Sequence, residues 1–517
     1  MNKILLFLMV FISIAIGSVD AQAIDTYINY LSNDTNADAA ACIAATPDGN
    51  YIISGMTGGQ WAMYGADGWI VKINPQGDTL WTRRVGGNGL DMLGAIIVNN
   101  NKYITVGFKS VFLSGRQGWL LAYDQSGNKL VDKTYGGALD DGLGDIIPVA
   151  GGGYLSLGTT KSYGTDSTQD VWLVKLNATF DLQWSKHFDL GVIIGDSSRN
   201  DNGNGIIPFE NNKYLITANT CKLCDGTDGV AWYSVIDSAG NLVGAPHIFN
   251  KGPKNVFAGG IRPTADGGAI ITGATSMIDS VYSHIPPLPP FRSEDMWIVK
   301  LNSNADTMWT KIYGQYGVYD GGWSIFQTTD GGYFMSAYSQ IGDVAGSNYD
   351  YDNVWLMRLN SVGDTIKVCR WGGPQNDDLV NIIPALDGGA IGVGCYNSNS
   401  MLPAPIPGNC DMLIMKTDCN IISGINAVTD DEIILSVFPN PASDMINIQL
   451  KLNTKGNVAI ELFDILGKKI AEENFYSSSG DLQVLKIDVT HINNGIYLLR
   501  TQTNNFTITS PVEIIKD

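Results

Sequence analysis

A block of 50 to 65 residues recurs along this chain and constrains its fold more than any other feature. Each copy contains an apolar stretch related to Asp-x-Trp-x-Val-Lys-Leu-Asn, which predicts a buried strand. The anchors of this stretch are separated by 50, 53, 60, 65, 58 and 58 residues, and they are Trp69, Trp119, Trp172, Trp232, Trp297, Trp355 and Leu413. A period of this length in a β-rich chain is typical of propeller blades or of a solenoid.

Each copy divides into four short predicted strands. One unit places the first two at residues 141–148 and 154–159 and the third around Trp172, and a fourth strand follows a Gly- or Asn-rich turn. The Asp-Gly-Gly-Tyr sequence at residues 330–333 has the residues of a tight hairpin turn. Four-stranded units suit propeller blades better than the coils of a β-helix. We therefore predict an all-β chain.

The two ends of the repeat region complement each other. Asp25 lies 13 residues before Asp38, which is the spacing that separates a fourth strand from the next blade in later copies. The mature chain thus begins with a fourth strand that belongs to no preceding blade, and the last copy lacks one. We expect residues 26–30 to pair with residues 412–416 and to close a seven-bladed β-propeller over residues 24–423.

The expected topology gives the ring two different faces. The turns between first and second strands and between third and fourth strands lie on one face, here called the turn face. The loops between second and third strands and the links between blades lie on the other, here called the loop face. Long and variable segments occur on the loop face, and such segments on a rigid scaffold are where function usually resides.

The first residues predict a secretory signal peptide over residues 1–23. Lys3 provides a positive start, residues 4–16 form an apolar run too short to span a bilayer, and Ala21-Gln22-Ala23 offers a cleavage site. No second long apolar stretch follows, so we expect no transmembrane segment. The net charge of −19 argues against nucleic acid as a partner, because phosphate binding requires clustered Lys and Arg.

Residues 437–517 have a different character from the repeats. Three motifs follow one another in this segment, and they are Pro439-Asn440-Pro441, Gly467-Lys468 and Gly495-Ile496-Tyr497. They closely resemble the type A C-terminal sorting domain of proteins exported by the type IX (Por) secretion system. The resemblance implies a small antiparallel β-sandwich, engagement of the type IX machinery, removal of this domain and display of the remainder on the outer cell surface. Residues 424–436 are the predicted linker.

The repeats themselves look like the Asp-Gly-Gly-Tyr/Asp-x-Trp-x-Val-Lys-Leu units of many secreted bacterial propellers. That resemblance implies a fold and almost no biochemistry, because one scaffold hosts many functions.

Most blades open with an aspartate five residues before an apolar residue. These aspartates are Asp38, Asp91, Asp141, Asp201, Asp320 and Asp377. A ring of carboxylates at the channel mouth could hold a cation or act in hydrolysis, but a position repeated in nearly every blade more often serves the scaffold. We expect each aspartate to cap its own strand by accepting backbone N–H groups.

A segment at residues 200–205, Asn-Asp-Asn-Gly-Asn-Gly, imitates the start of a calcium loop. Its twelfth position is Asn211 where a Glu is required, so an ordinary blade link is expected.

Enzyme chemistry has little support in the sequence. The repeat region holds two glutamates, Glu210 in a tight turn and Glu294 in a long loop without an evident carboxylate partner. A glycosidase would therefore have to use aspartates. His187 and His247 are expected on outer strands, with no nucleophile motif beside them. We assign no catalytic residue, no metal ligand and no cofactor.

Three long segments on the loop face of blades four to seven provide the better candidate site. The segment at 276–294 is rich in proline and aromatic residues, which lower the ordering cost of a binding loop, and 339–351 and 397–409 lie beside it. The candidate ligand-binding residues are Tyr282, His284, Phe291, Arg292, Tyr349 and Tyr351.

These loops favour a non-catalytic surface module that binds a glycan or a protein. Two alternatives stay open: a surface polysaccharide hydrolase or lyase that uses channel-mouth aspartates, and a structural component of the surface coat.

The seven cysteines are too few for a disulfide scaffold, and their odd number leaves at least one thiol unpaired within the monomer. Cys395 is predicted to end the second strand of the last blade and Cys410 to begin its third, so the two can meet at disulfide distance. Cys221 and Cys224 form a lone Cys-x-x-Cys, for which a small disulfide or two loop thiols is a better interpretation than zinc.

Overall fold

The computed structural model describes the greater part of the propeller and of the C-terminal region. The described residues are 27–31, 37–59, 65–111, 115–164, 168–196, 198–222, 229–249, 255–275, 294–314, 319–340, 352–371, 376–386, 389–396, 410–417, 434–438, 443–451, 456–464, 468–477, 482–502, 507–514 and 516. The chain divides into two compact units, one spanning residues 24–421 and one containing residues 422–517. The predicted signal peptide and residues 424–433 of the predicted linker lie outside the described residues, whereas residues 434–436, which were also assigned to the linker, belong to the first strand of the C-terminal unit.

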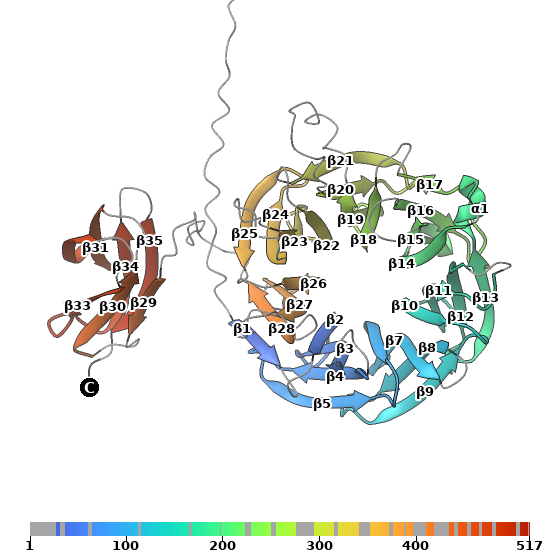
Figure 1. The fold of residues 1–517 in the computed structure, drawn as a ribbon, viewed down its shortest axis with the longest axis horizontal. Coiled ribbons are helices and arrows are strands. Elements are labelled where there is room, and N and C mark those ends of the chain that lie inside the picture. The colour runs from blue at the N-terminus through green and yellow to red at the C-terminus, as the bar shows by residue number, and fades with distance from the viewer. Residues whose placement is uncertain are drawn as a thin grey trace, which may run out of the picture. The chain divides into compact units, whose positions relative to one another are not determined.

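Within the described part of the propeller unit, seven four-stranded antiparallel sheets follow one another around a ring (Figure 1). We number these blades 1 to 7 from the sheet that begins with β2. Blade 1 contains β2 (Ala37–Ala45), β3 (Tyr51–Gly59), β4 (Asp67–Ile73) and β5 (Thr79–Val85). Blade 2 contains β6 (Met92–Asn99), β7 (Lys102–Val111), β8 (Gly115–Tyr123) and β9 (Lys129–Tyr135). Blade 3 contains β10 (Asp141–Pro148), β11 (Tyr154–Thr160), β12 (Asp170–Leu176) and β13 (Leu182–Phe188).

The second half of the ring repeats this order from inner to outer strand. Blade 4 contains β14 (Asn200–Pro208), β15 (Tyr214–Cys221), β16 (Val230–Ile236) and β17 (His247–Ile248). Blade 5 contains β18 (Val256–Pro263), β19 (Ala269–Thr275), β20 (Asp295–Leu301) and β21 (Thr307–Tyr313). Blade 6 contains β22 (Asp320–Gln327), β23 (Tyr333–Gln340), β24 (Asp352–Leu359) and β25 (Thr365–Trp371). Two short helices, α1 (Leu190–Ile194) and η1 (Glu210–Asn212), flank β14.

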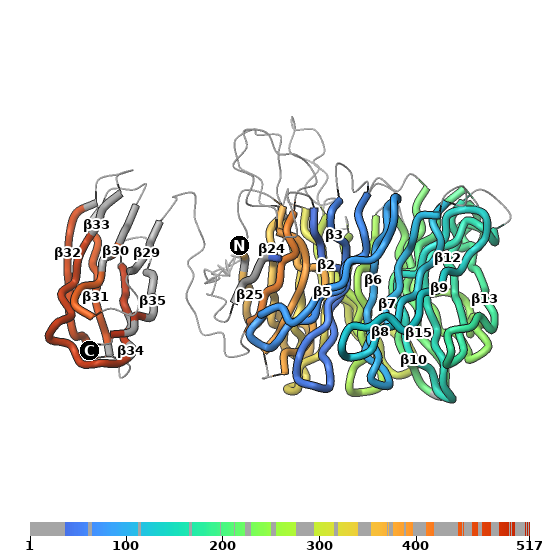
Figure 2. Tube along the Cα trace, turned by 90° about the horizontal axis from the view of Figure 1, so that it is seen from below, coloured from blue at the N-terminus to red at the C-terminus, as the bar shows by residue number. Residues whose placement is uncertain are grey.

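Blade 7 is built from both ends of the repeat region. It contains β26 (Asp377–Pro384), β27 (Ala390–Tyr396) and β28 (Asp411–Thr417), and β1 (Tyr27–Leu31) is its outermost strand. Tyr27 pairs with Lys416 and Leu31 with Met412, in antiparallel register. The predicted closure by the N-terminal strand is confirmed. Figure 2 shows the ring from the side, with the hairpin turns of the turn face along its lower edge.

The core lies between neighbouring blades rather than at the centre of the ring. The repeated tryptophans act as wedges there, and Trp119, Trp172 and Trp232 are at most 1% exposed. Trp172 of blade 3, for example, packs with Val106 and Leu120 of blade 2. This arrangement explains why strand residues are apolar on both faces, since each sheet is covered on both sides.

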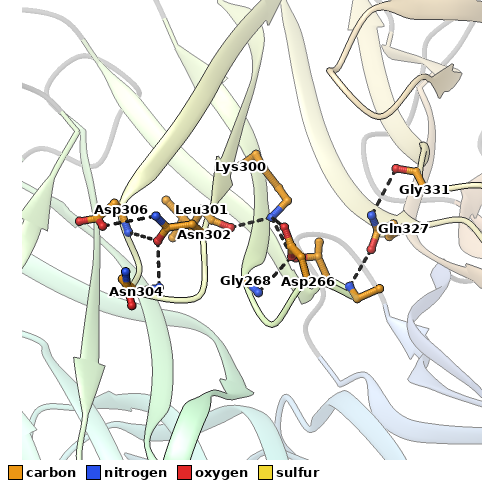
Figure 3. A network of polar contacts seen from close by, with 11 residues as sticks. Asp266, Gly268, Lys300, Leu301, Asn302, Asn304, Asp306, Gln327 and Gly331 are labelled. Atoms are coloured by element: carbon orange, nitrogen blue, oxygen red, sulfur yellow. Dashed lines mark hydrogen bonds and ion pairs between the residues drawn. The ribbon is translucent and has the colours of Figure 1, made fainter.

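The repeated Lys and Asp-Gly-Gly positions form an ion pair within a blade (Figure 3). In blade 5, Lys300 Nζ lies 2.8 Å from Asp266 Oδ2 and donates to the carbonyl oxygen of Leu301 at 2.7 Å. Asp266 Oδ1 also accepts from the backbone N–H of Gly268 at 3.1 Å. Burial opposes the charged form of Asp266, but Lys300 and the Thr264 hydroxyl hold the pKa of that carboxyl at about 2.

The same pairing recurs in other blades, with Lys72 bound to Asp48 at 2.5 Å and Arg358 bound to Asp330. The repeated aspartate and the repeated Lys or Arg therefore form an ion pair that connects the turn between the first two strands with the third strand of the same blade.

Cysteine pairing ties the loop-face ends of blade 7. Cys395 and Cys410 form a disulfide with Cα atoms 5.6 Å apart, which is within the range that disulfide geometry allows. Cys221 is also disulfide-bonded, whereas Cys42 and Cys369 are free thiols.

The C-terminal unit consists of two antiparallel sheets around a common core. One sheet contains β29 (Ile434–Phe438), β30 (Met445–Lys451) and β33 (Leu482–Asp488). The other contains β31 (Gly456–Asp464), β32 (Lys469–Ser477), β34 (Gly495–Gln502) and β35 (Thr507–Ile514). Ile446, Ile460 and Leu499 pack together in this core. The motif residues Gly495, Ile496 and Tyr497 open β34, and Lys468 directly precedes β32, whereas Pro439, Asn440, Pro441 and Gly467 lie outside the described residues.

Replacing Asp266 by Ala will lower the free energy of unfolding by about 1–2 kcal/mol, because the Lys300 side chain is only 4% exposed and would lose its charged partner. The expected loss of unfolding free energy is small for an ion pair because the Asp266 side chain is itself 47% exposed and screened by solvent. Chemical denaturation measures the change. As a control, Asp306→Ala removes an exposed carboxylate of the same blade and will change stability by less than about 0.5 kcal/mol. Equal losses in the two variants would contradict a structural role for the pair.

Candidate binding site at the channel mouth

The inner strands of all seven blades line a central cavity of about 610 Å³. Each inner strand contains an irregularity in its pairing with the second strand, at the same place in each repeat, such as Leu143/Asp145 in blade 3 and Gly322/Ser324 in blade 6. A β-bulge of this kind re-aims side chains. The residue three positions after the repeated aspartate lies in the bulge, where it lines the channel.

One blade carries a bulky residue at this bulge. The equivalent residues in five other blades are small or aliphatic, and blade 4 has Asn204, whose side chain bonds to the carbonyl oxygen of Ala258; the five are Ala41, Gly94, Gly144, Gly259 and Val380. Blade 6 has Trp323 here, and its side chain is 38% exposed in the cavity. Gly321 and Gly322 precede it. The indole therefore projects from a rigid inner strand into the channel.

Trp323 is held by two neighbours. Its Nε1 donates to Asp378 Oδ1 on β26 at 3.2 Å. Its ring lies 5.5 Å from the ring of Tyr338 on β23, tilted by 47°. These contacts from blades 6 and 7 fix the orientation of the indole and leave part of its surface accessible. An exposed aromatic surface with adjacent polar groups is typical of ligand sites.

Glu294 completes the cluster from blade 5. Its backbone carbonyl accepts from the N–H of Asp320 at 2.7 Å, which anchors it beside the inner strand of blade 6. Burial raises the pKa of the Glu294 carboxyl, and a hydrogen bond with the Tyr338 side chain opposes this effect. We call Glu294, Trp323, Tyr338 and Asp378 the mouth cluster. A carboxyl with a raised pKa beside an aromatic surface can donate a hydrogen bond or a proton to a ligand.

The mouth cluster lies at the loop face, at the bases of the three predicted binding segments. The first segment ends at Glu294, the second begins directly after Tyr338, and Asp378 pairs with Cys395, close to where the third begins. The six predicted ligand residues, Tyr282, His284, Phe291, Arg292, Tyr349 and Tyr351, lie outside the described residues. The sequence predicted no carboxylate partner for Glu294, and the partner that the structure adds is the Tyr338 side chain, which is hydrogen-bonded to it.

The repeated aspartates serve the scaffold. All six are at most 3% exposed. Asp38 Oδ1 accepts from the N–H of Gly58 at 3.0 Å and Asp91 Oδ1 from that of Ser110 at 2.7 Å, while Asp141 Oδ2 accepts from Gly137 at 2.7 Å. The carboxylates accept backbone N–H groups as predicted, but the donors lie on the second strand of the blade (Gly58, Ser110) or in the link before it (Gly137) rather than on the aspartate's own strand. Residues 200–208 form strand β14 rather than a calcium loop.

Other polar groups in the channel are bonded between blades. Asp145 Oδ2 accepts from the N–H of Ile206 at 2.9 Å, and Asn381 Oδ1 accepts from that of Ile43 at 3.2 Å. Burial raises the pKa of the Asp145 carboxyl. These side chains link inner strands to the next blade, so the mouth cluster is the better candidate for ligand contact.

A second group of carboxylates lies between blades 3 and 4. Asp170, Asp189 and Asp201 each place one oxygen within 4.8 Å of the others, which is close enough for a shared metal ion.

Comparison with known families identifies the C-terminal region. Residues 436–516 match the family described as "Secretion system C-terminal sorting domain". The chain therefore carries a type IX sorting domain, which directs export to the cell surface or the exterior. Within the described ranges, no helix combines the length and apolarity needed to cross a membrane.

The propeller resembles solved structures in fold alone. An α-L-arabinofuranosidase from Fusarium graminearum is 10% identical, with 77% of this chain and 97% of that chain covered and a TM-score of 0.39. An α-L-arabinanase from Penicillium chrysogenum is 9% identical, with 78% and 98% covered and a TM-score of 0.39. A puromycin hydrolase is 9% identical, with 81% of this chain and 59% of that chain covered and a TM-score of 0.42. No curated protein matches the sequence significantly.

Replacing Glu294 by Gln will change how stability depends on pH. Because burial raises the folded-state pKa of Glu294 above its ordinary value of 4.5, the wild-type protein loses stability as pH rises from 4.5 through the folded-state pKa. The Gln variant lacks this loss, so its stability relative to wild type will increase across that window and then level off. Thermal unfolding at a series of pH values measures the difference. A difference in stability between Glu294→Gln and the wild type that stays the same at every pH would refute a raised pKa of the Glu294 carboxyl.

Proposed function

We propose that this protein is exported by type IX secretion and displayed at the cell surface, where its propeller binds a saccharide at the loop-face mouth of the channel. The exposed indole of Trp323, which is bonded to Asp378 and lies beside Tyr338, the hydrogen-bond partner of Glu294, is the observation that carries the proposal. Aromatic faces contact the apolar side of a sugar ring, and carboxylates accept hydrogen bonds from its hydroxyl groups. The scaffold fixes these four residues on or beside strands, so the site is preorganised.

The three loop segments extend this proposed site. Tyr282, His284, Phe291 and Arg292 lie in the segment that ends beside Glu294, and Tyr349 and Tyr351 lie in the segment that begins beside Tyr338. Chain connectivity to the mouth cluster supports assigning them to the same ligand. Aromatic residues in such loops add contact area at low entropic cost.

Replacing Trp323 by Ala will weaken saccharide binding by about 1–3 kcal/mol, because the indole supplies the central contact surface. A glycan array identifies the ligand, and isothermal titration measures the affinity of the variant. Leu80→Ala, which trims an exposed residue of outer strand β5, will bind as the wild type does. Unchanged affinity in a folded Trp323→Ala variant would move the site away from the channel mouth.

Deleting residues 280–291 will lower the affinity further while leaving the melting temperature of the propeller nearly unchanged. The segment joins two strands of blade 5 outside the repeated core positions, and loop length changes closure entropy only slowly. Differential scanning calorimetry and titration with the same ligand separate the two effects. A deletion variant that binds normally would remove the loops from the site.

Hydrolysis of the bound saccharide is the second candidate, and the raised pKa of Glu294 favours it. A carboxyl whose pKa is raised above its ordinary value keeps its proton to higher pH and can act as a general acid toward a glycosidic oxygen. Incubation of the protein with polysaccharides, followed by detection of reducing ends, tests this activity. Glu294→Gln will abolish cleavage but retain binding if hydrolysis occurs. Binding without cleavage by the wild-type protein would instead establish a non-catalytic module.

A further inference from the structure

A second cavity, of about 330 Å³, lies at the loop face above blade 3. Its floor includes Gly142, at the start of β10. Phe108 and Arg116 line it from blade 2, Gln169 lines it from the residue before β12, and Asn202 lines it from blade 4. We call these five residues and the space between them the blade 3 slot. None of the five belongs to the mouth cluster.

The slot is open because blade 3 has a glycine at the position that follows the repeated aspartate. A Cβ at Gly142 would have one neighbour within 4 Å, the Cβ of Phe108 at 3.7 Å. Blade 6 also has a glycine here, Gly321, but the Tyr338 ring occupies the space into which its Cβ would project. Thr159 takes the place of Tyr338 in blade 3 and is too small to fill that space. Four other blades fill it with larger side chains, namely Met92, Asn202, Phe257 and Asp378.

Phe108 and Arg116 form a fixed wall of the slot. The guanidinium carbon of Arg116 lies 5.0 Å from the centre of the Phe108 ring. Asp140 holds the arginine in place, because its Oδ1 accepts from the backbone N–H of Arg116 at 2.9 Å and its Oδ2 lies 3.5 Å from Nη2. The wall therefore combines an aromatic ring with a positioned group of N–H donors. These are the contacts that the apolar side and the hydroxyl groups of a sugar ring require.

Two amide side chains supply further polar groups to the slot. Asn202 Oδ1 accepts from the Thr159 hydroxyl at 3.3 Å, whereas Asn202 Nδ2 forms no hydrogen bond within the described part of the chain. The side-chain amide of Gln169 likewise forms none among the described residues. An amide group both donates and accepts hydrogen bonds, so these two side chains can bind the hydroxyl groups of a sugar.

The slot is continuous with the central cavity. Gly94, Gly144 and Gly203, on the inner strands of blades 2, 3 and 4, line both. Blade 3 is three blades away from blade 6 in the described ring, so the slot and the mouth cluster lie across the channel from each other, beside β10 and β22 respectively (Figure 1). A short saccharide can occupy one of the two places, whereas a chain of several units is needed to reach both.

We propose that the blade 3 slot is a second saccharide subsite, and that one extended polysaccharide chain occupies it together with the mouth cluster, a proposal that rests on the saccharide site proposed there. One sugar unit lies against Trp323 and another against Phe108, with Asn202 and Gln169 bonded to the hydroxyl groups of the second unit. The two contacts reinforce each other, because the second forms within a complex that the first has already made. The propeller therefore selects long chains over free sugars.

The dependence of affinity on chain length tests this subsite. Affinity electrophoresis against arabinan, galactan, xylan, mannan and alginate selects a polysaccharide that retards the wild-type protein. Isothermal titration with its fragments, from the disaccharide to about twelve units, will show an affinity that rises about tenfold or more with length. Gly142→Phe gives blade 3 the residue that blade 5 has as Phe257 and will fill the slot. Long fragments will then bind this variant no more tightly than short ones.

Phe108→Ala is the second variant, which removes the aromatic wall and will lose most of the rise even if Gly142→Phe does not fold. Leu130→Ala trims an exposed residue of outer strand β9 in blade 2 and is the control, with the rise of the wild type. Equal wild-type affinity for all lengths, or a full rise in the folded slot variants, would overturn the subsite and leave the mouth cluster unaffected. If none of the polysaccharides retards the wild-type protein, the proposed function itself fails, and the subsite with it.

Discussion

The pairing of β1 with β28 is the constraint on which the rest of the propeller depends. Tyr27 meets Lys416 across a separation that spans nearly the whole repeat region. Without β1, the last blade would expose an unpaired strand edge, and the ring would have a seam without its outer strand. The same seam is bonded on its inner side, where Asn381 accepts from the N–H of Ile43 and the Tyr51 hydroxyl accepts from that of Leu386. A closed ring holds neighbouring blades in fixed positions and therefore fixes any site built between them.

The candidate site arises where this scaffold departs from its own repeat. Trp323 occupies a bulge position that five other blades fill with small or aliphatic residues and blade 4 with Asn204. The repeated residues are already engaged in structural bonds, such as that from Ser110 to Asp91. A departure from a structural repeat costs stability unless a new partner replaces the lost contact. This is the physical reason to look for ligands at such positions.

Much of the fold could be predicted from the sequence because the repeat carries its own bonding pattern. The Asp-Gly-Gly turn and the Lys of the third strand are ion-paired partners, and the spacing of Asp25 to Asp38 marks the displaced fourth strand. The mouth cluster could not be predicted from the sequence to the same extent. The cluster combines residues of three blades, namely Glu294, Trp323, Tyr338 and Asp378. Their proximity depends on the closed ring and on β-bulges that no local sequence pattern predicts. The out-of-place tryptophan was the one available signal.

The central claim is that the N-terminal strand is an integral part of the ring, and native-state hydrogen exchange tests it most directly. The backbone amides of residues 27–31 that bond to β28, and those of β28 that bond to β1, should exchange only through global unfolding, with protection similar to that of the buried strand β12. Protection of this size across the seam would show that the ring opens as one cooperative unit. Exchange of residues 27–31 at the rate of an unstructured peptide, while β12 stays protected, would show that the strand does not close the propeller.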